Sequence, residues 1–348
     1  MQRHTLLLFL LLIQAVSYGQ AYSLQYIDTK TDASFRGLSV APDNAIWVSG
    51  SKGWVGRSAN GGQDWTFMQV PGYETLDFRT LYAIDSNNAI IANAGSPAYI
   101  LRTTDGGTSW KQVYKNTDSA AFIDGIDFWN NKHGIIHGDP INGHMLLLYT
   151  KDGGKTWKER KNSPKMGEGE ASFAASGTVI NCFLHGAVVL AVGGKTSKLF
   201  FSRSRGRRWR SIPTPMLAGE ASTGIFSFMH GGSAWHWLIA GGDYRNDTLR
   251  TANFFYSQHK GKEWLAPETT TRGYRECLAS VYDTHKKERP KAMFAVGPSG
   301  IDISTDRGVN WQPLSDDKGF HVIKASIDNN RLFLAGSNGK LAIMTITQ

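Results

Sequence analysis

Cysteine is scarce in this chain, with only Cys182 and Cys277 among 348 residues. The two lie in repeats, described below, that are not neighbours, so we expect two buried free thiols rather than a disulfide. Residues spaced so widely also exclude a dithiol redox motif. The chain has no glycine-rich nucleotide fingerprint and no nucleophile elbow, so the sequence predicts no cofactor.

Long apolar runs are also missing, except at the start, "MQRHTLLLFLLLIQAVSYGQ". Arg3 gives this segment a positive beginning, the apolar run begins at Leu6, and a small residue, Gly19, precedes a plausible cleavage position. The run is too short for a membrane span, and no cysteine follows it for lipid attachment. We therefore expect residues 1–19 to be a signal peptide. The expected product, 20–348, is a single exported domain, periplasmic or extracellular, with no transmembrane segment.

Acidic residues are outnumbered: 38 Lys and Arg against 29 Asp and Glu give a net charge of +9, which becomes +8 when the single Arg of the signal peptide is removed. This excess favours acidic partners in general. The basic residues are scattered except for one dense run, Arg203, Arg205, Arg207, Arg208 and Arg210. We interpret this run as part of a solvated edge strand. No recognition motif accompanies it, so nucleic acid is not an expected partner.

Tryptophan, in contrast, recurs at a nearly constant spacing. Successive members of one set are 45, 47, 52, 55 and 47 residues apart, namely Trp65, Trp110, Trp157, Trp209, Trp264 and Trp311. Periods of this length indicate a propeller or a solenoid. The first period contains four short β-type runs, "RGLSVA", "AIWVSG", "GWVGRSA" and "DWTFMQV". Four short strands per repeat are typical of a propeller blade, so the predicted fold class is all-β.

Each of these tryptophans follows a similar turn, as in "LRTTDGGTSW" (101–110), "YTKDGGKTW" (149–157) and "ISTDRGVNW" (303–311). An aspartate such as Asp105 can accept hydrogen bonds from nearby backbone amides, and the glycines accept positive φ. A residue that recurs is not a unique catalyst, so we expect a structural turn. Repeats four and five, "FSRSRGRRW" (201–209) and "YSQHKGKEW" (256–264), lack the aspartate. We assign Arg205, and His259 with Lys260, to its position.

Six complete blades are predicted, at 36–70, 78–114, 122–160, 171–212, 221–266 and 274–315. The tail adds three strands, "FHVIKAS", "RLFLAG" and "LAIMTIT", without a tryptophan turn, and "YSLQYID" (22–28) is an unpaired strand at the other end. That strand can complete the last blade and close the ring, which also removes exposed strand edges. The 329 residues after the signal peptide divided by seven give 47, the observed period. We predict a seven-bladed β-propeller of four-stranded blades.

Strand direction alternates within a blade, so the tryptophan turns share a face with the turns between strands one and two. The more individual loops lie on the opposite face, where function is expected. They include "GDPINGH" (138–144) and "GGDYRND" (241–247), with the blade connections "PKMGEGEAS" (164–172) and "PMLAGEAS" (215–222). These provide the candidates Asp139, Glu170, Asp243 and Tyr244. "GEAS" occurs twice, through repeat duplication or through a shared role of Glu170 and Glu220.

The beginnings of the inner strands align as "FRGL" (35–38), "FRTL" (78–81), "GYRE" (273–276) and "FHVI" (320–323). This alignment places Arg36, Arg79, Arg275 and His321 at the channel mouth. Guanidinium groups match the geometry of carboxylate or phosphate, so one hypothesis is an anion-binding mouth. The other is that each arginine pairs with a nearby acid, such as Glu170, Asp243 or Glu276, and only lines the ring.

A metal site is not expected in "HGIIHGDPINGH", although it contains His133, His137, Asp139 and His144. His133 and His137 would lie about 13 Å apart on a strand, too far to share an ion.

The tryptophan turns resemble the Asp-box, or BNR, repeat. The whole chain after residue 19 resembles the bacterial propellers grouped with photosystem II stability and assembly factors, through "GEGEASFAASG", "STGIFSF", "GGDYRND", "GYRE" and "AVGPSGIDISTDRGVNW". Their exported relatives outside phototrophs are often labelled oxidoreductases, a label that no residue pattern here supports. The resemblance implies a propeller that holds a client protein on a basic patch. Arg36, Arg79 and Arg275 would serve that purpose here.

Sialidase-type glycosidases also carry Asp-boxes, and "FRGL" partly resembles their Phe-Arg-Ile-Pro segment. Such enzymes use three arginines, a Tyr–Glu pair and an aspartic acid, and the chain offers Tyr244, Tyr274, Glu168 and Glu170. The Ile-Pro is absent, the loop "GSKG" (50–53) has no acid, and seven blades replace six.

The sequence thus predicts an exported, non-catalytic propeller that binds a protein client or an anionic ligand such as an acidic glycan at an arginine-lined loop face. The alternative is a glycoside hydrolase. The predicted contact residues are Arg36, Arg79, Arg275, His321, Asp139, Glu170, Asp243 and Tyr244.

Overall fold

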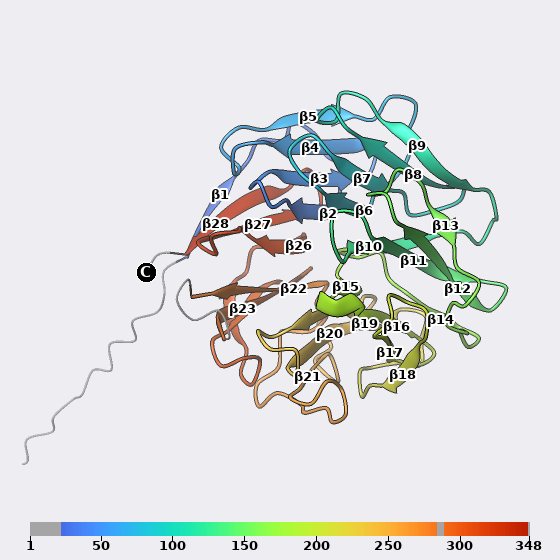
Figure 1. Cartoon of the computed structure of the whole chain (residues 1–348). Helices are drawn as coiled ribbons and strands as arrows, with labels where there is room; N and C mark the ends of the chain where they lie inside the picture. Colours follow the sequence, from blue (N-terminus) through green and yellow to red (C-terminus); the bar gives the residue numbers. More distant parts are fainter. Residues whose placement is uncertain (1–21, 284–288, 347–348) are drawn as a thin grey trace, which may run out of the picture.

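The computed structural model of the chain describes residues 22–283 and 289–346. The predicted signal peptide lies outside the described residues. Strands form nearly all the regular structure, and the one helical element in the described part is a single 3-10 turn, η1 (Leu184–Gly186). No helix among these residues is long and apolar enough to cross a membrane. Figure 1 shows the strands arranged as blades around a central axis.

The blades follow one another along the chain, each built of antiparallel strands. Blade one contains β2 (Phe35–Val40), β3 (Ile46–Gly50), β4 (Trp54–Ser58) and β5 (Thr66–Gln69). Blade two contains β6 (Thr80–Ala83), β7 (Ala89–Ala92), β8 (Ala98–Thr103) and β9 (Lys111–Asn116). Blade three contains β10 (Ile123–Phe128), β11 (Gly134–Ile141), β12 (His144–Thr150) and β13 (Lys158–Glu159). Blade four contains β14 (Glu170–Ala171), β15 (Ile180–Cys182), β16 (Val188–Gly194), β17 (Lys198–Ser202) and β18 (Arg210–Pro213). Blade five contains β19 (Thr223–His230), β20 (Trp237–Asp243) and β21 (Phe254–Ser257). Blade six contains β22 (Cys277–Tyr282), β23 (Pro290–Gly297), β24 (Gly300–Ser304) and β25 (Gln312–Ser315).

The seventh blade joins the two ends of the chain, as predicted. It consists of β26 (Phe320–Ala325), β27 (Arg331–Gly336), β28 (Leu341–Ile346) and β1 (Tyr22–Tyr26). β1 pairs antiparallel with β28, with Tyr22 opposite Ile346 and Tyr26 opposite Ala342. In Figure 1 the blue β1 lies beside the red β28. The prediction of a seven-bladed ring closed by an N-terminal strand is therefore confirmed.

Blades four and five differ from the regular pattern. They share one continuous sheet, because Gly193 of β16 pairs with Gly224 of β19. A Cβ on either glycine would lie 2.6 Å or less from the other's Cα, so no larger residue fits. The outermost strand of blade five is reduced to a single bridge between Tyr256 and Leu265. Pro267 follows, and proline cannot donate to a strand ladder.

The core lies between the blades, and the repeated tryptophans contribute to it. Trp110 packs edge-on against Trp47 of the preceding blade, with ring centroids 6.2 Å apart. Trp311 packs in the same way against Phe254, at 4.9 Å. Burial of rings of this size contributes a large share of the apolar area removed from water. The predicted packing role of the tryptophans is confirmed.

The turn before each tryptophan is held by its own side chains. In repeat two, Asp105 Oδ1 accepts a hydrogen bond from the Ser109 amide at 2.9 Å, and Thr103 Oγ1 accepts one from the Gly107 amide at 3.0 Å. The bonds that the carboxylate accepts from Ser109 and from Thr103 Oγ1 lower the pKa of Asp105 to about 2, and Ser109 contributes most. Gly106 has φ of 73°, which a residue with a Cβ adopts at a cost. Asp105 is a turn residue.

Repeat four needs a correction. Ser204, not Arg205, occupies the aspartate position, because its Oγ accepts the equivalent bond from the Arg208 amide at 3.1 Å. Arg205 occupies the first glycine position with φ of 53°. In repeat five Lys260 does the same, with φ of 56°, and His259 holds the aspartate position. Both turns have therefore lost their acid while keeping their shape.

The tryptophan turns lie beside the turns between strands one and two, as expected. The Gly106 amide donates to the Asn87 carbonyl at 3.0 Å, and the Gly153 amide donates to the Lys132 carbonyl at the same distance. We call this side of the ring the Asp-box face and the opposite side the loop face.

Candidate functional site

The loop face carries the predicted site residues, and the inner strands decide where their side chains lie. Strand register is interrupted after Phe35 in blade one, Ile123 in blade three, Ile225 in blade five and Phe320 in blade seven. The next residue of each strand is an extra, unpaired one, and such bulges redirect a side chain. The residues concerned are Arg36, Asp124, Phe226 and His321. Arg79 and Glu276 take this position in blades two and six, immediately before the first residue of β6 and of β22.

Arg275 was predicted to lie at the mouth, and this is wrong. The Arg275 amide donates to the carbonyl of Gly241 in the preceding blade, as the Phe78 amide donates to Gly50. Arg275 is therefore equivalent to Phe78, and Glu276 to Arg79. The correct alignment is "RECL" (275–278) with "FRTL" (78–81), shifted by one residue from the predicted one. Because successive strand side chains point to opposite sides, this shift moves Arg275 out of the channel.

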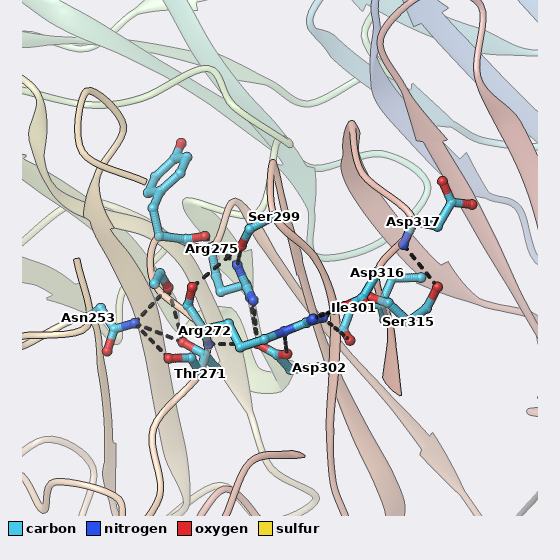
Figure 2. Close-up of polar contacts among 12 residues, drawn as sticks. Asn253, Thr271, Arg272, Arg275, Ser299, Ile301, Asp302, Ser315, Asp316 and Asp317 are labelled. Carbon is cyan, nitrogen blue, oxygen red and sulfur yellow. Dashed lines mark hydrogen bonds and ion pairs between the residues drawn. The ribbon is translucent and has the colours of Figure 1, made fainter. Parts of the chain in front are cut away.

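Arg275 is instead fully buried between blades, with no exposed side-chain surface. Its Nε and Nη2 both bind Asp302 Oδ2, with Nε at 2.8 Å, and its Nη1 donates to Ser299 Oγ at 2.9 Å. Arg272 Nε reaches the other carboxylate oxygen of Asp302 at 2.7 Å. Figure 2 shows the two guanidinium groups converging on this one carboxylate. A forked donor set satisfied in this way has a structural role.

Glu170 occupies the position in blade four that Arg275 occupies in blade six. The prediction that its side chain lies at the mouth is also wrong. It is buried, and its Oε1 pairs with Lys198 Nζ at 2.6 Å. Burial raises its pKa, but the bonds from Lys198, Thr196 and the Gly167 amide outweigh that effect and leave the pKa lowered. Glu220, in the second "GEAS", is exposed. The two copies therefore have no shared role.

Arg36, Glu276 and His321 form one buried ionic cluster at the mouth. Glu276 Oε2 accepts from Arg36 Nη1 at 2.7 Å and lies 3.0 Å from His321 Nδ1. Burial raises the pKa of Glu276, and the positive groups more than offset it, so its pKa is lowered. Arg36 also donates to the Ala175 carbonyl at 3.1 Å. The expected pairing with nearby acids is thus found for Arg36 and Arg275, and Arg79 also pairs with an acid, Asp77.

A segment that the sequence did not predict crosses the channel. Residues 172–179, here called the channel segment, leave blade four between β14 and β15. Ser176 Oγ donates to the Glu276 carbonyl at 2.7 Å, and Thr178 Oγ1 donates to Ser227 Oγ at 2.8 Å. Phe173 stacks on Phe226 with ring centroids 3.9 Å apart. The channel segment is thereby bonded to blades five and six as well as to Arg36.

Above the channel segment lies a hollow of about 340 Å³, here called the mouth hollow. Its lining combines charged and aromatic side chains and includes Arg36, Arg79, Asp139, Phe226, Tyr244, Tyr274 and Glu276. Four predicted residues, Arg36, Arg79, Asp139 and Tyr244, are thus brought together. Arg275, Glu170, Asp243 and His321 do not line it; Asp243 accepts a bond from the Arg245 amide at 2.9 Å within its own turn, and His321 contributes through Glu276.

Arg79 is the least constrained cation of the mouth hollow. Its Nε donates to Asp77 Oδ2 at 2.7 Å, and its side chain is 36% exposed. The structure assigns its two Nη atoms no hydrogen bond among the described residues, so they can donate to a ligand. Tyr244, in the same lining, is 47% exposed and meets Phe226 edge-on with ring centroids 6.1 Å apart. A cation and an exposed ring therefore face the same space.

Two carboxyl groups below Arg79 have raised pKa values. Burial, followed by the nearby charge of Asp139, raises the pKa of Asp124 well above its usual value, against the opposing effect of Arg79. Burial also raises the pKa of Asp139, which accepts from the Ser172 amide at 3.1 Å. Neighbouring His137 is fully buried, which lowers its pKa to about 3. No group of three or more metal-ligating side chains occurs in the described part of the chain.

Sequence reasoning missed Phe226, which lines the mouth hollow, and Asp124, which is fully buried at the equivalent strand position. A usable signal is present in "FRGL" (35–38), "IDGI" (123–126) and "IFSF" (225–228). In each of these segments the third residue is small and the fourth is apolar, so the three can be aligned. The second position of each segment is the extra residue of the bulge. The channel segment leaves no such signal, because it is irregular.

Comparisons with known proteins agree with this architecture. A family model described as photosynthesis system II assembly factor YCF48 matches residues 16–121, and the BNR/Asp-box repeat model matches residues 148–159. No curated protein matches the chain.

Solved structures are similar over nearly the whole chain. One described as "YCF48 bound to D1 peptide" has a TM-score of 0.65 at 17% identity, covering 93% of this chain and 97% of that one. YCF48 from Cyanidioschyzon merolae gives 0.60 at 14% identity, covering 92% and 98%. The GH74 xyloglucanase from Xanthomonas campestris gives 0.58 at 15% identity, covering 92% of this chain and 53% of the enzyme. The chain is thus a propeller with BNR/Asp-box turns, its first third matches the YCF48 family model, and its fold is similar to that of the solved YCF48 structures.

Proposed function

We propose that the chain is an exported, non-catalytic propeller that binds a peptide segment of a client protein in the mouth hollow. The observation that carries the proposal is that Arg79, whose Nη atoms have no hydrogen bond among the described residues, and the exposed ring of Tyr244 line the same hollow. A guanidinium end matches a carboxylate, and an aromatic platform favours an apolar side chain. The preferred segment is therefore one with an acidic group next to an apolar residue. The structurally similar YCF48 has been solved with a D1 peptide, which supports a peptide as the ligand.

The mouth hollow is suited to binding because its floor is rigid. The channel segment is bonded to the inner strands of other blades, and the Arg36–Glu276 pair is largely shielded from solvent, with side chains 21% and 5% exposed. A pre-ordered floor reduces the conformational entropy lost on binding. These groups hold the site, whereas Arg79 and Tyr244 make the contacts.

The test is photo-crosslinking from within the hollow. A photoreactive phenylalanine analogue at position 244 is expected to capture a client protein, and Arg79→Glu is expected to abolish the adduct. Lys111→Glu is the matched control, since Lys111 is an exposed residue of the outer strand β9 and its reversal changes net charge equally. Both variants must keep the parent Tm. An adduct that survives Arg79→Glu, or an adduct with no protein component, would refute the proposal.

Glycoside hydrolysis is the second candidate, favoured by one observation. Asp139 with a raised pKa and Glu276 with a lowered pKa line the same hollow, and glycosidases use one protonated and one ionised carboxyl group. Hydrolysis of fluorogenic sialosides and uronides, lost in Asp139→Asn and in Glu276→Gln, would establish it. The absence of hydrolysis alongside a retained crosslink would leave client binding as the function.

A further inference from the structure

A second concavity, beside blades four and five, is on the Asp-box face, away from the mouth hollow. Two adjoining hollows, of about 670 and 420 Å³, share Phe201, Arg203 and Lys260 in their walls. We call the two together the blade 4–5 groove. Each of the two hollows lies within the range of about 300–1,000 Å³ that is typical of small-molecule sites.

One half of the groove is apolar. Trp129, Phe183, Phe201 and Trp237 line it. Trp129 is held in place because its Nε1 donates to the Ala187 carbonyl at 2.7 Å. Cys182 also lines this half and is only half-buried, which corrects the prediction of two buried thiols; Cys277 is buried as expected.

The other half is cationic, and no carboxylate lines it. Its walls contain Arg203, Arg208, Arg210, Lys260 and Lys262 with Trp209, Trp235 and His259. None of the ion pairs found in the described part of the chain involves these five cations. The arginine run was interpreted from sequence as a solvated edge strand, and the structure instead places part of it in a concave wall.

Two of the cations are positioned by aromatic rings. Lys260 Nζ lies 4.0 Å from the centroid of Trp235, and the Arg210 guanidinium lies 5.4 Å from that of Phe201. Trp235 is nevertheless 55% exposed, an unusual state for so large an apolar side chain. The groove thus presents ordered positive charge beside accessible apolar surface.

Both turns that border the cationic half lack an acid at the aspartate position. Repeats two, three and six place a carboxylate there, as Asp105 and Asp306 do, and repeat one has the neutral Asn60, whereas repeats four and five have Ser204 and His259. Ser204 preserves the hydrogen bond to the Arg208 amide, so the turn is retained and only the negative charge is missing. Loss of the acid in these two neighbouring turns leaves the positive field of the groove uncompensated.

We propose that the blade 4–5 groove binds a small amphipathic anion. Its acyl or aromatic body would occupy the apolar half, and its carboxylate, phosphate or sulfate would meet Arg203, Arg208 and Lys260. A peptide is less suited, because β17, which supplies Phe201, is hydrogen-bonded on both sides, to β16 and β18, and offers no edge for strand addition. This site is separate from the mouth hollow and does not depend on the proposed client.

Isothermal titration calorimetry on the full chain tests the proposal, with dodecyl phosphate and dodecanoate below their micelle concentrations as probes. Octyl glucoside supplies an apolar body without charge, and inorganic phosphate supplies charge without the body. We expect one site for each amphipathic anion and at least tenfold weaker binding of both controls. Equal binding of octyl glucoside, or tighter binding of a Glu- and Phe-containing peptide, would overturn the proposal.

Two variants separate the contributions. Arg203→Glu reverses a charge shared by both halves, and Ala234→Trp fills the apolar half without changing charge, since Ala234 lines it. Each is expected to weaken dodecyl phosphate at least tenfold. Arg250→Glu, an exposed residue between β20 and β21, is the control and should leave the Kd unchanged. Equal affinity in Arg203→Glu and the parent would refute the site.

Discussion

Replacement of the buried pair Arg275–Asp302 gives the sharpest test of the inner-strand alignment. Both side chains are essentially unexposed, and the positions equivalent to Arg275 in blades one, two and seven hold Phe35, Phe78 and Phe320. Arg275→Phe therefore introduces the residue type of those three blades but leaves Asp302 with Arg272 alone. Asp302→Leu leaves the Arg275 guanidinium buried without a counter-charge.

The expected magnitudes follow from the cost of an uncompensated buried charge, about 3–5 kcal/mol when one partner is removed. Arg275→Phe should lie near the lower end, because Arg272 still binds Asp302, and Asp302→Leu near the upper end. Since the entropy of unfolding is about 2.1 cal/mol/K per residue, a ring of this size loses roughly 4–7 °C of Tm for that range. The double variant should be more stable than either single one, because no charge is then left buried.

The measurement is a double-mutant cycle by urea denaturation and calorimetry. Coupling is shown if the double variant recovers most of the free energy of unfolding lost in Asp302→Leu. Strict additivity, with the double variant losing the sum of the single effects, would mean that the two charges are not coupled. The placement of Arg275 as a structural residue would then be refuted.

Three further predictions follow from the geometry. The pKa of His137 is about 3 in the fold and 6.5 in the unfolded chain, so the unfolded state binds more protons as the pH falls below 6.5, and about 2 kcal/mol of the free energy of unfolding should be lost between pH 8 and 5. Urea denaturation at the two pH values should show a smaller loss in His137→Gln. An equal loss in the variant and the parent would contradict the assignment to His137. Glu170→Ala should cost about 2–4 kcal/mol by leaving Lys198 unpaired, whereas exposed Glu220→Ala should stay within about 0.5 kcal/mol; equal values would restore a shared role. Ser204→Asp should keep the parent Tm but weaken dodecyl phosphate binding severalfold in calorimetry, and unchanged affinity would show that the missing acid is irrelevant to the groove.

The fold could be predicted because its signals are periodic and local. The spacing of Trp65, Trp110 and Trp157 gives the blade length, and the three tail strands without a tryptophan turn leave one strand missing, which the strand beginning at Tyr22 supplies. Such patterns survive because each blade must bury the same kind of layer.

The site was harder to predict, for two physical reasons. First, side chains alternate along a strand, so aligning Arg275 with Arg79 instead of with Phe78 made a core residue look like a channel residue. The four residues that do line the mouth hollow came from segments with an unambiguous register or from loops. Second, the channel segment and the blade 4–5 groove are formed by contacts between residues far apart in the chain, such as Ser176 with Glu276. No local pattern encodes those contacts.

The pairing of β1 with β28 also has a consequence for the order of events during folding. Its partners are separated by more than 300 positions in the sequence, as with Tyr22 and Ile346. This pairing therefore has the largest loop-closure entropy cost of the strand pairs in the ring. The free energy gained by the pairing offsets that cost only when the intervening blades are in place. The ring therefore closes last, after both ends exist. A chain interrupted before β28 would keep an unpaired strand on each side of the gap, a surface that chaperones and proteases recognise in incomplete products. The closing strand thus distinguishes a finished molecule from an unfinished one.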